Sequence, residues 1–195
     1  MKNVLQKELL PLFLIIAFPI NTWSIYILFY NFEWVAERTN TWDAIGYGAY
    51  ALAFALFESL FISLIIAPFY FLLRKNHDLD ISRVILGLTF LMIALWVIVE
   101  RVNTSQDNSL ITMIFRIKSK YNLRYRYTLA LIFMAAGAIA ASMIMPPFLV
   151  RKYKKLKNFT IVLFQRLELL SYIYLALNLV SIVIVIIRNM GDIQI

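Results

Sequence analysis

Long apolar stretches separated by short charged segments dominate the chain. A helix needs about 20 residues to cross the hydrocarbon core of a bilayer. Five stretches meet or approach that length, and they predict membrane spans at about residues 9–32, 44–73, 84–99, 127–150 and 169–187. The third is the shortest, and it needs the charged side chains at its ends to reach toward the headgroups while their stems stay in lipid.

The runs predict helices, because strands of a membrane barrel alternate apolar and polar residues over about ten positions and these runs are continuous. In lipid, a helix also satisfies its backbone hydrogen bonds within one segment. We therefore expect an all-α, polytopic transmembrane helix bundle in which residues 1–195 form a single integral membrane domain. The connections between the spans are too short for a folded soluble domain.

The first stretch, 9–32, admits two readings. It is longer than the apolar region of a usual signal peptide, and no small-residue cleavage site follows it, so we interpret it as a retained helix. The alternative is a re-entrant hairpin, which Pro11, Pro19 and Asn21 would support and which would lower the number of crossings by one.

The segment 110–121 differs from the five spans because it mixes apolar and basic residues. Wound as a helix, it has an apolar side, and Arg116 and Lys120 face away from it. This pattern is typical of an amphipathic helix lying in the membrane interface. Alternate residues are also apolar, which would suit a strand. We favour the interfacial helix.

The composition narrows the class further. AVILMFWYC residues make up 62% of the chain and charged residues 15%, against about 45 to 50% and about 25% in soluble domains. The chain has no cysteine, and its one histidine is His77, which excludes disulfides, thiolate metal sites and bis-histidine haem. No phosphate-binding glycine loop, nucleophile with a positioned base or close carboxylate pair is visible. We expect no cofactor, and an enzyme is the least favoured class.

The distribution of lysine and arginine gives a weak orientation. The predicted loops on the N-terminal side carry slightly more of these residues than the loops on the other side, and the positive-inside rule counts only the basic residues. We expect a bacterial or archaeal cytoplasmic membrane with the N-terminus inside.

Glu58 interrupts the second apolar stretch near its middle. A carboxylate at the bilayer centre costs about 2.5 to 3.5 kcal/mol on insertion scales, so the protein must compensate it. Glu58 is either a proton or cation site or a hydrogen-bonded group that fixes helix packing. The sequence shows no basic partner and leaves both readings open.

A stripe of polar residues runs along the fifth stretch. Its members are spaced by three or four residues, which places them on one side of a helix. They either bond neighbouring helices together, which we favour, or line a polar cavity. With Glu58, they form the candidate intramembrane polar site: Glu168, Ser171, Tyr174, Asn178 and Ser181.

Small residues recur four apart in the fourth stretch, at Ala136 and Ala140 and at Gly137 and Ala141. Small residues at this spacing let two helix backbones approach closely. We expect a packing surface, used within the chain or against another subunit, and no ligand site.

Two basic clusters are candidates for contact with anionic lipid headgroups, to which each cation near the leaflet contributes about 1 kcal/mol. Nucleic-acid binding is a remote alternative that we set aside. The residues are Arg151, Lys152, Lys154, Lys155 and Lys157, together with Arg116, Lys118 and Lys120.

Three functions remain. The favoured one is a non-enzymatic integral membrane protein, a packing, assembly or accessory subunit of a membrane complex. The alternative is a small transporter or lipid-handling protein with a polar path at Glu58 and the polar stripe. A membrane-embedded enzyme acting on lipid-linked substrates comes third. The expected partners are the lipid bilayer with its anionic headgroups and another membrane protein or a second copy of the chain.

Overall fold

The computed structural model describes residues 8–75, 79–105, 109–122 and 124–191. This part of the chain is α-helical and contains no strand, so the prediction of an all-α bundle is confirmed. His77 lies outside the described residues. The helices are α2 (Leu10–Tyr30), α3 (Phe32–Arg38), α4 (Thr41–Arg74), α5 (Leu79–Ser105), α6 (Leu110–Tyr121), α7 (Tyr125–Lys152) and α8 (Lys154–Gly191).

Five of these helices, α2, α4, α5, α7 and α8, are long and apolar enough to cross a membrane. The first stretch forms one unbroken helix with Pro19 inside it, rather than the two arms of a hairpin. Pro11 lies in the first turn of α2, where backbone amides have no hydrogen-bond acceptor within the helix, so its lack of an amide hydrogen costs no hydrogen bond.

The fifth span begins much earlier than expected. The predicted stretch started at residue 169, but α8 is continuous from Lys154 and includes the charged residues Arg166 and Glu168. Charged residues mark where a chain leaves lipid, and they do not by themselves end a helix. At 1.5 Å per residue, the 38 residues of α8 extend about 57 Å, which exceeds a hydrocarbon core of about 30 Å.

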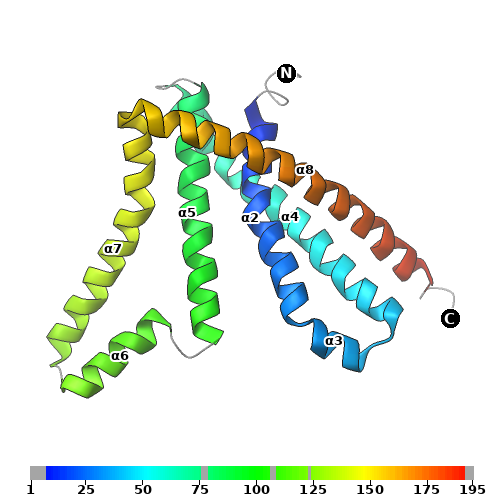
Figure 1. Ribbon diagram of the computed structural model, residues 1–195, viewed down its shortest axis with the longest axis horizontal. Helices are drawn as coiled ribbons and strands as arrows, with labels where there is room; N and C mark the ends of the chain where they lie inside the picture. The colour runs from blue at the N-terminus through cyan, green and yellow to red at the C-terminus, as the bar shows by residue number, and fades with distance from the viewer. Residues whose placement is uncertain (1–7, 76–78, 106–108, 123, 192–195) are drawn as a thin grey trace.

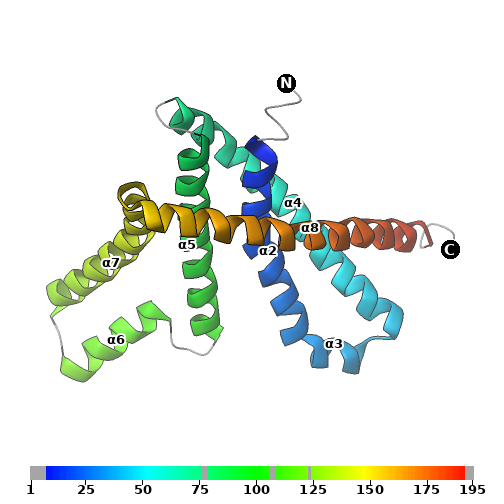
Figure 2. The same cartoon turned by 45° about the horizontal axis from the view of Figure 1, so that its top comes forward.

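The helices form two groups (Figure 1). In one, α4 lies against both α2 and α8; in the other, α5 lies against α7, and α6 lies beside α7. The groups meet where α2 contacts α5 and where α8 contacts α7. Consecutive spans run in opposite directions, while α8 crosses in front of α5 and α2, and Figure 2 shows it nearly at right angles to them.

The apolar core lies where the two groups join. Its main cluster combines side chains from four spans: Ile15, Val84, Leu88, Val150 and Phe164. A second cluster between α2 and α4 contains Leu12, Ile16 and Tyr70. The core therefore lies toward the end of the bundle where α2 begins.

Gly87 of α5 makes room for the largest side chain of the main cluster. A Cβ atom at this position would lie 2.8 Å from Cε2 of Phe164 and 3.1 Å from Cγ2 of Ile15. Since real Cβ atoms do not approach so closely, the absence of a side chain at Gly87 is what lets the Phe164 ring lie against α5.

Ion pairs tie the spans together at both ends of the bundle. Arg74, at the end of α4, pairs with Glu8 just before α2. At the opposite end, Arg188 of α8 pairs with Asp43 in the first turn of α4 and also donates to the Trp42 carbonyl oxygen at 3.0 Å. Glu8 and Arg188 are thus at opposite ends, as an odd number of crossings requires.

Segment 110–121 is a helix, not a strand. The Ser109 side chain caps its N-terminus by accepting a hydrogen bond from the Thr112 amide at 3.2 Å. The helix ends at Asn122 in the left-handed conformation, with φ of 45°. It lies between the lower ends of α5 and α7 in Figure 1, with Arg116 exposed on its surface.

Candidate functional site

Two residues of the polar stripe of α8, Ser171 and Tyr174, contact α2. The fully buried Ser171 hydroxyl shares its proton between the carbonyl oxygens of Leu14 in α2 (2.7 Å) and Leu167 in its own helix (2.9 Å). Ser181, also buried, donates only within α8, to the Leu177 carbonyl oxygen at 2.8 Å. Ser171 therefore joins two helices, and Ser181 does not.

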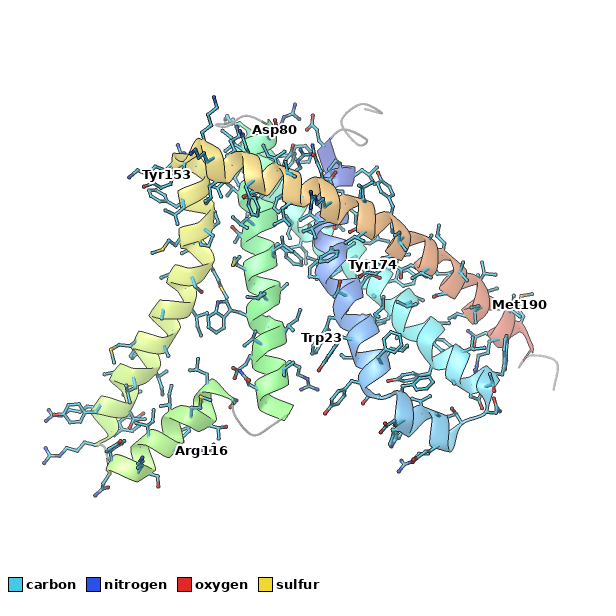
Figure 3. All side chains as sticks on the ribbon, viewed as in Figure 1. Trp23, Asp80, Arg116, Tyr153, Tyr174 and Met190 are labelled. Carbon is cyan, nitrogen blue, oxygen red and sulfur yellow. The ribbon has the colours of Figure 1, made fainter. Side chains whose placement is uncertain are left out.

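The next turn of the stripe continues this contact. The Thr22 hydroxyl donates to the Tyr174 hydroxyl at 3.3 Å, and the Tyr174 ring lies 6.0 Å from the Phe18 ring between centroids. Figure 3 labels Tyr174 on α8 where this helix crosses α2. Tyr174 contributes a mixed polar and aromatic contact to the α2–α8 interface.

Asn178 is the one stripe residue whose polar atoms all lack partners. Its side chain is fully buried, and neither amide atom makes a hydrogen bond within the described residues. Asn21 of α2 is a second fully buried asparagine. Its side-chain oxygen is buried without a hydrogen bond in the described residues, although its side-chain nitrogen donates to the Ala17 carbonyl oxygen at 2.9 Å.

Glu168 lies at one end of the stripe, near the first turn of α5. Its carboxylate is 3.9 Å from the Arg83 guanidinium, which also lies 3.4 Å from the carboxylate of Asp80. Arg83 is largely buried between these two acids. Glu168 thus belongs to a charged cluster at the end of the bundle where α5 begins.

Glu58 is not brought together with the stripe. Its side chain is exposed on the outer surface of α4 and makes no hydrogen bond or ion pair within the described part of the chain. The neighbouring Ser59 is the residue that α4 buries, and its hydroxyl donates to the Ala55 carbonyl oxygen at 2.7 Å. The exposed aromatic residues Phe57 and Phe61 flank Glu58 on the outer surface.

The two basic clusters lie at opposite ends of α7. The larger cluster occupies the last turn of α7 and the first turn of α8, around Tyr153, and the smaller one lies on α6 near Arg116 (Figure 3). Lys152 and Lys118 each lie near an aromatic ring, those of Tyr153 and Phe115. Contact of either cluster with lipid remains a prediction.

The small-residue surface of α7 faces outward. A Cβ atom at Gly137 would meet nothing within 4 Å, and Ala136, Ala140 and Ala141 are exposed. In the most apolar part of α7 only 6% of the residues are buried, against 39% in α2. No other helix of the described chain covers this surface.

A pocket between α2 and α5 was not predicted from the sequence. It measures about 360 Å³ and is lined by Trp23, Tyr26 and Tyr30 on one side and Arg101 on the other. The aromatic residues are three and four apart on α2, so their common face was visible in the sequence. Their proximity to Arg101 was not, because it depends on how α2 and α5 pack.

Together these features define a polytopic α-helical membrane protein with a buried polar interface and two outward-facing features, Glu58 and the small-residue surface of α7. No group of three or more histidine, cysteine or acidic residues suited to a metal ion occurs in the described residues. No family model matches the chain, and comparisons with curated proteins and with solved structures find no significant match.

The Ser171 bond gives a direct test of the α2–α8 contact. Ser171→Ala should lower the free energy of unfolding by about 0.6 to 1.7 kcal/mol, the range for hydrogen bonds between membrane helices. Ser181→Ala is the matched control, since its hydroxyl bonds only its own helix, and it should have a much smaller effect. The measurement is SDS-induced unfolding in mixed micelles, and equal effects of the two substitutions would contradict the assignment.

Proposed function

We propose that this chain is a non-enzymatic subunit of a membrane complex, which packs against a partner through the outer surfaces of α4 and α7. The observation that carries the proposal is the position of Glu58. Its carboxyl group lies near the middle of a 34-residue apolar helix, points outward and has no partner in the described chain.

The cost of this arrangement supports a covering partner. An acidic side chain facing hydrocarbon is unfavourable by about 2.5 to 3.5 kcal/mol on insertion scales, and such residues usually face protein or water. A polar or basic side chain from a second membrane helix would remove the penalty. Nothing within the described chain does so, and the exposed aromatic residues Phe57 and Phe61 beside Glu58 would supply apolar contact area for that helix.

The surface of α7 supports the same conclusion independently. Close approach of two membrane helices relies on small residues four apart, which leave the backbones accessible to each other. Ala136, Gly137, Ala140 and Ala141 form such a surface and are left uncovered. A lipid-facing helix has no need of this spacing, so a helix of another subunit is the occupant we infer.

The test is the size and composition of the particle extracted in mild detergent. We expect the wild-type chain to migrate with a stoichiometric partner or a second copy. Glu58→Gln should shift the equilibrium toward the single chain by about 5- to 30-fold, since interhelical polar contacts contribute about 1 to 2 kcal/mol. Gly137→Leu should shift it in the same direction, because the larger side chain prevents close approach of the two helix backbones.

Glu37→Gln is the control for Glu58, because it neutralises an exposed acid on α3, outside the apolar spans. It should leave the particle unchanged. A wild-type particle containing one chain alone would contradict the proposal, as would a complex unaffected by both substitutions in α4 and α7.

A small transporter is the second candidate, favoured by the buried side-chain amide of Asn178, which makes no hydrogen bond within the described residues. A hydrated polar site beside α8 would satisfy this side chain. Flux measurements on liposomes containing the chain alone separate the two functions, since the subunit proposal expects no flux and the transporter requires it.

A further inference from the structure

Several polar groups line the pocket between α2 and α5 without a hydrogen bond in the described part of the chain. Trp23 and Tyr26 stack with their ring centroids 5.3 Å apart, and Tyr26 and Tyr30 follow at 6.0 Å. The indole nitrogen, both phenol groups and the guanidinium of Arg101 across the pocket make no hydrogen bond within the described residues. Figure 3 shows Trp23 on the side of α2 that faces α5.

Arg101 differs from the other arginines that connect helices. Arg74, Arg83 and Arg188 are each paired with an acidic side chain. Arg101 has no acidic partner in the described chain, and the neighbouring carboxylate of Glu100 is directed to the Leu110 amide at the start of α6, at 3.3 Å. A guanidinium that faces aromatic rings across a pocket, and whose donors make no hydrogen bond within the described residues, is suited to bidentate recognition of a phosphate group.

A second, apolar groove adjoins the pocket on the other side of Arg101. It measures about 530 Å³ and lies between α5, α6 and α7, with Trp96, Val97, Ile111 and Ile139 in its walls. Arg101 and Thr104 line both spaces. One ligand with an anionic head and an apolar tail would therefore contact Arg101 with its head and the groove with its tail.

The pocket lies at a level of the bundle that suits a ligand with an anionic head and an apolar tail. The pocket lies toward the C-terminal ends of α2 and α5, and it shares Arg101 and Thr104 with the groove that α6 helps to form. Tryptophan and tyrosine side chains concentrate at the headgroup level of a bilayer. The phosphate groups of membrane lipids lie at the same level.

We propose that Arg101 and the aromatic face of Trp23, Tyr26 and Tyr30 bind the phosphate headgroup of an anionic phospholipid, with an acyl chain in the groove beside Val97 and Ile139. This site is separate from the basic clusters on α6 and at the α7–α8 corner, and it does not depend on the function proposed above.

The test is lipid retention by the intact protein, followed by native mass spectrometry after exchange into micelles that contain equal amounts of phosphatidylglycerol and phosphatidylcholine. We expect preferential retention of phosphatidylglycerol. Arg101→Gln should weaken it by about tenfold or more, the magnitude expected for loss of a charge-assisted hydrogen bond. Arg101→Lys should weaken it less, since the charge remains and the bidentate geometry is lost.

Two further variants separate this site from general surface charge. Arg38→Gln removes the same charge from α3, where Arg38 lies over the Trp34 ring and lines neither space, and it should leave retention unchanged. Val97→Trp fills the groove from a position that is 63% exposed, so the fold should tolerate it while retention falls.

Competition with glycerol phosphate distinguishes a lipid from a free phosphate. The soluble headgroup lacks the chain that fills the groove and should not displace the bound lipid. Equal retention of the two lipids by the wild-type chain, an Arg101→Gln variant with unchanged preference, or equal losses in Arg38→Gln and Arg101→Gln would overturn the proposal. Unchanged helical circular dichroism in each variant verifies that the fold is retained.

Discussion

Replacing Phe164 by alanine is expected to lower the free energy of unfolding by about 3 kcal/mol. Truncation of a buried phenylalanine costs about 3 to 5 kcal/mol in soluble proteins. The low end applies here because packing, rather than transfer out of water, stabilises contacts between membrane helices. Phe164 is 2% exposed and lies where α2, α5, α7 and α8 meet, so its loss would loosen the junction between the two helix groups.

The matched control for this prediction is Phe159→Ala on the same helix, because Phe159 is 68% exposed and should contribute little. Gly87→Leu supplies a second check. Alone, it should destabilise the protein by about 1 to 3 kcal/mol through overpacking against the Phe164 ring. Combined with Phe164→Ala, it should recover part of the loss, and strict additivity of the two effects would contradict direct contact.

Replacing Arg74 by glutamine should have an effect of similar size. Glu8 is buried, with 5% exposure, and Arg74 is its partner. Removing one member of a buried pair costs about 3 to 5 kcal/mol, since the other charge stays uncompensated. We expect about 3 kcal/mol, because the Arg74 side chain is itself 37% exposed and part of its interaction is screened. SDS-induced unfolding measures the change.

The double substitution Glu8→Gln with Arg74→Gln distinguishes an uncompensated charge from lost packing. It leaves two neutral amides that can bond to each other, and it should recover most of the stability lost in Arg74→Gln. Lys75→Gln, at an exposed position one residue later, is the charge control and should be nearly neutral. If the double variant were less stable than Arg74→Gln alone, the destabilisation would not come from Glu8.

Hydropathy was sufficient to predict the number and class of the long helices. Each apolar run was long enough to require a helix in lipid, and the two-sided pattern of 110–121 indicated a helix of a different kind. The ends of the helices were harder to predict from the sequence. The end of an apolar run indicates where the chain leaves lipid. A helix ends only where its backbone hydrogen bonding stops, so α8 includes Arg166 and Glu168 and begins at Lys154.

The rotation of each helix about its axis was the other feature that the sequence did not specify. α4 is apolar on all sides, so nothing in its sequence showed that Ser59 would be buried and Glu58 exposed. The stripe on α8 differs because its polar residues share one face, and the structure places Ser171 and Asn178 of that face in the interior. Contacts between helices, such as Arg101 with the aromatic face of α2, follow only from the packing.

The extent of α8 has a consequence for the membrane that surrounds the protein. A rod of about 57 Å cannot stand upright in a bilayer with a core of about 30 Å without exposing apolar residues to water. The Arg188–Asp43 pair holds one end of α8, and the corner with α7 holds the other. A thicker or thinner host bilayer would therefore act on the protein mainly by changing the inclination of α8, and through it the spacing of the two helix groups.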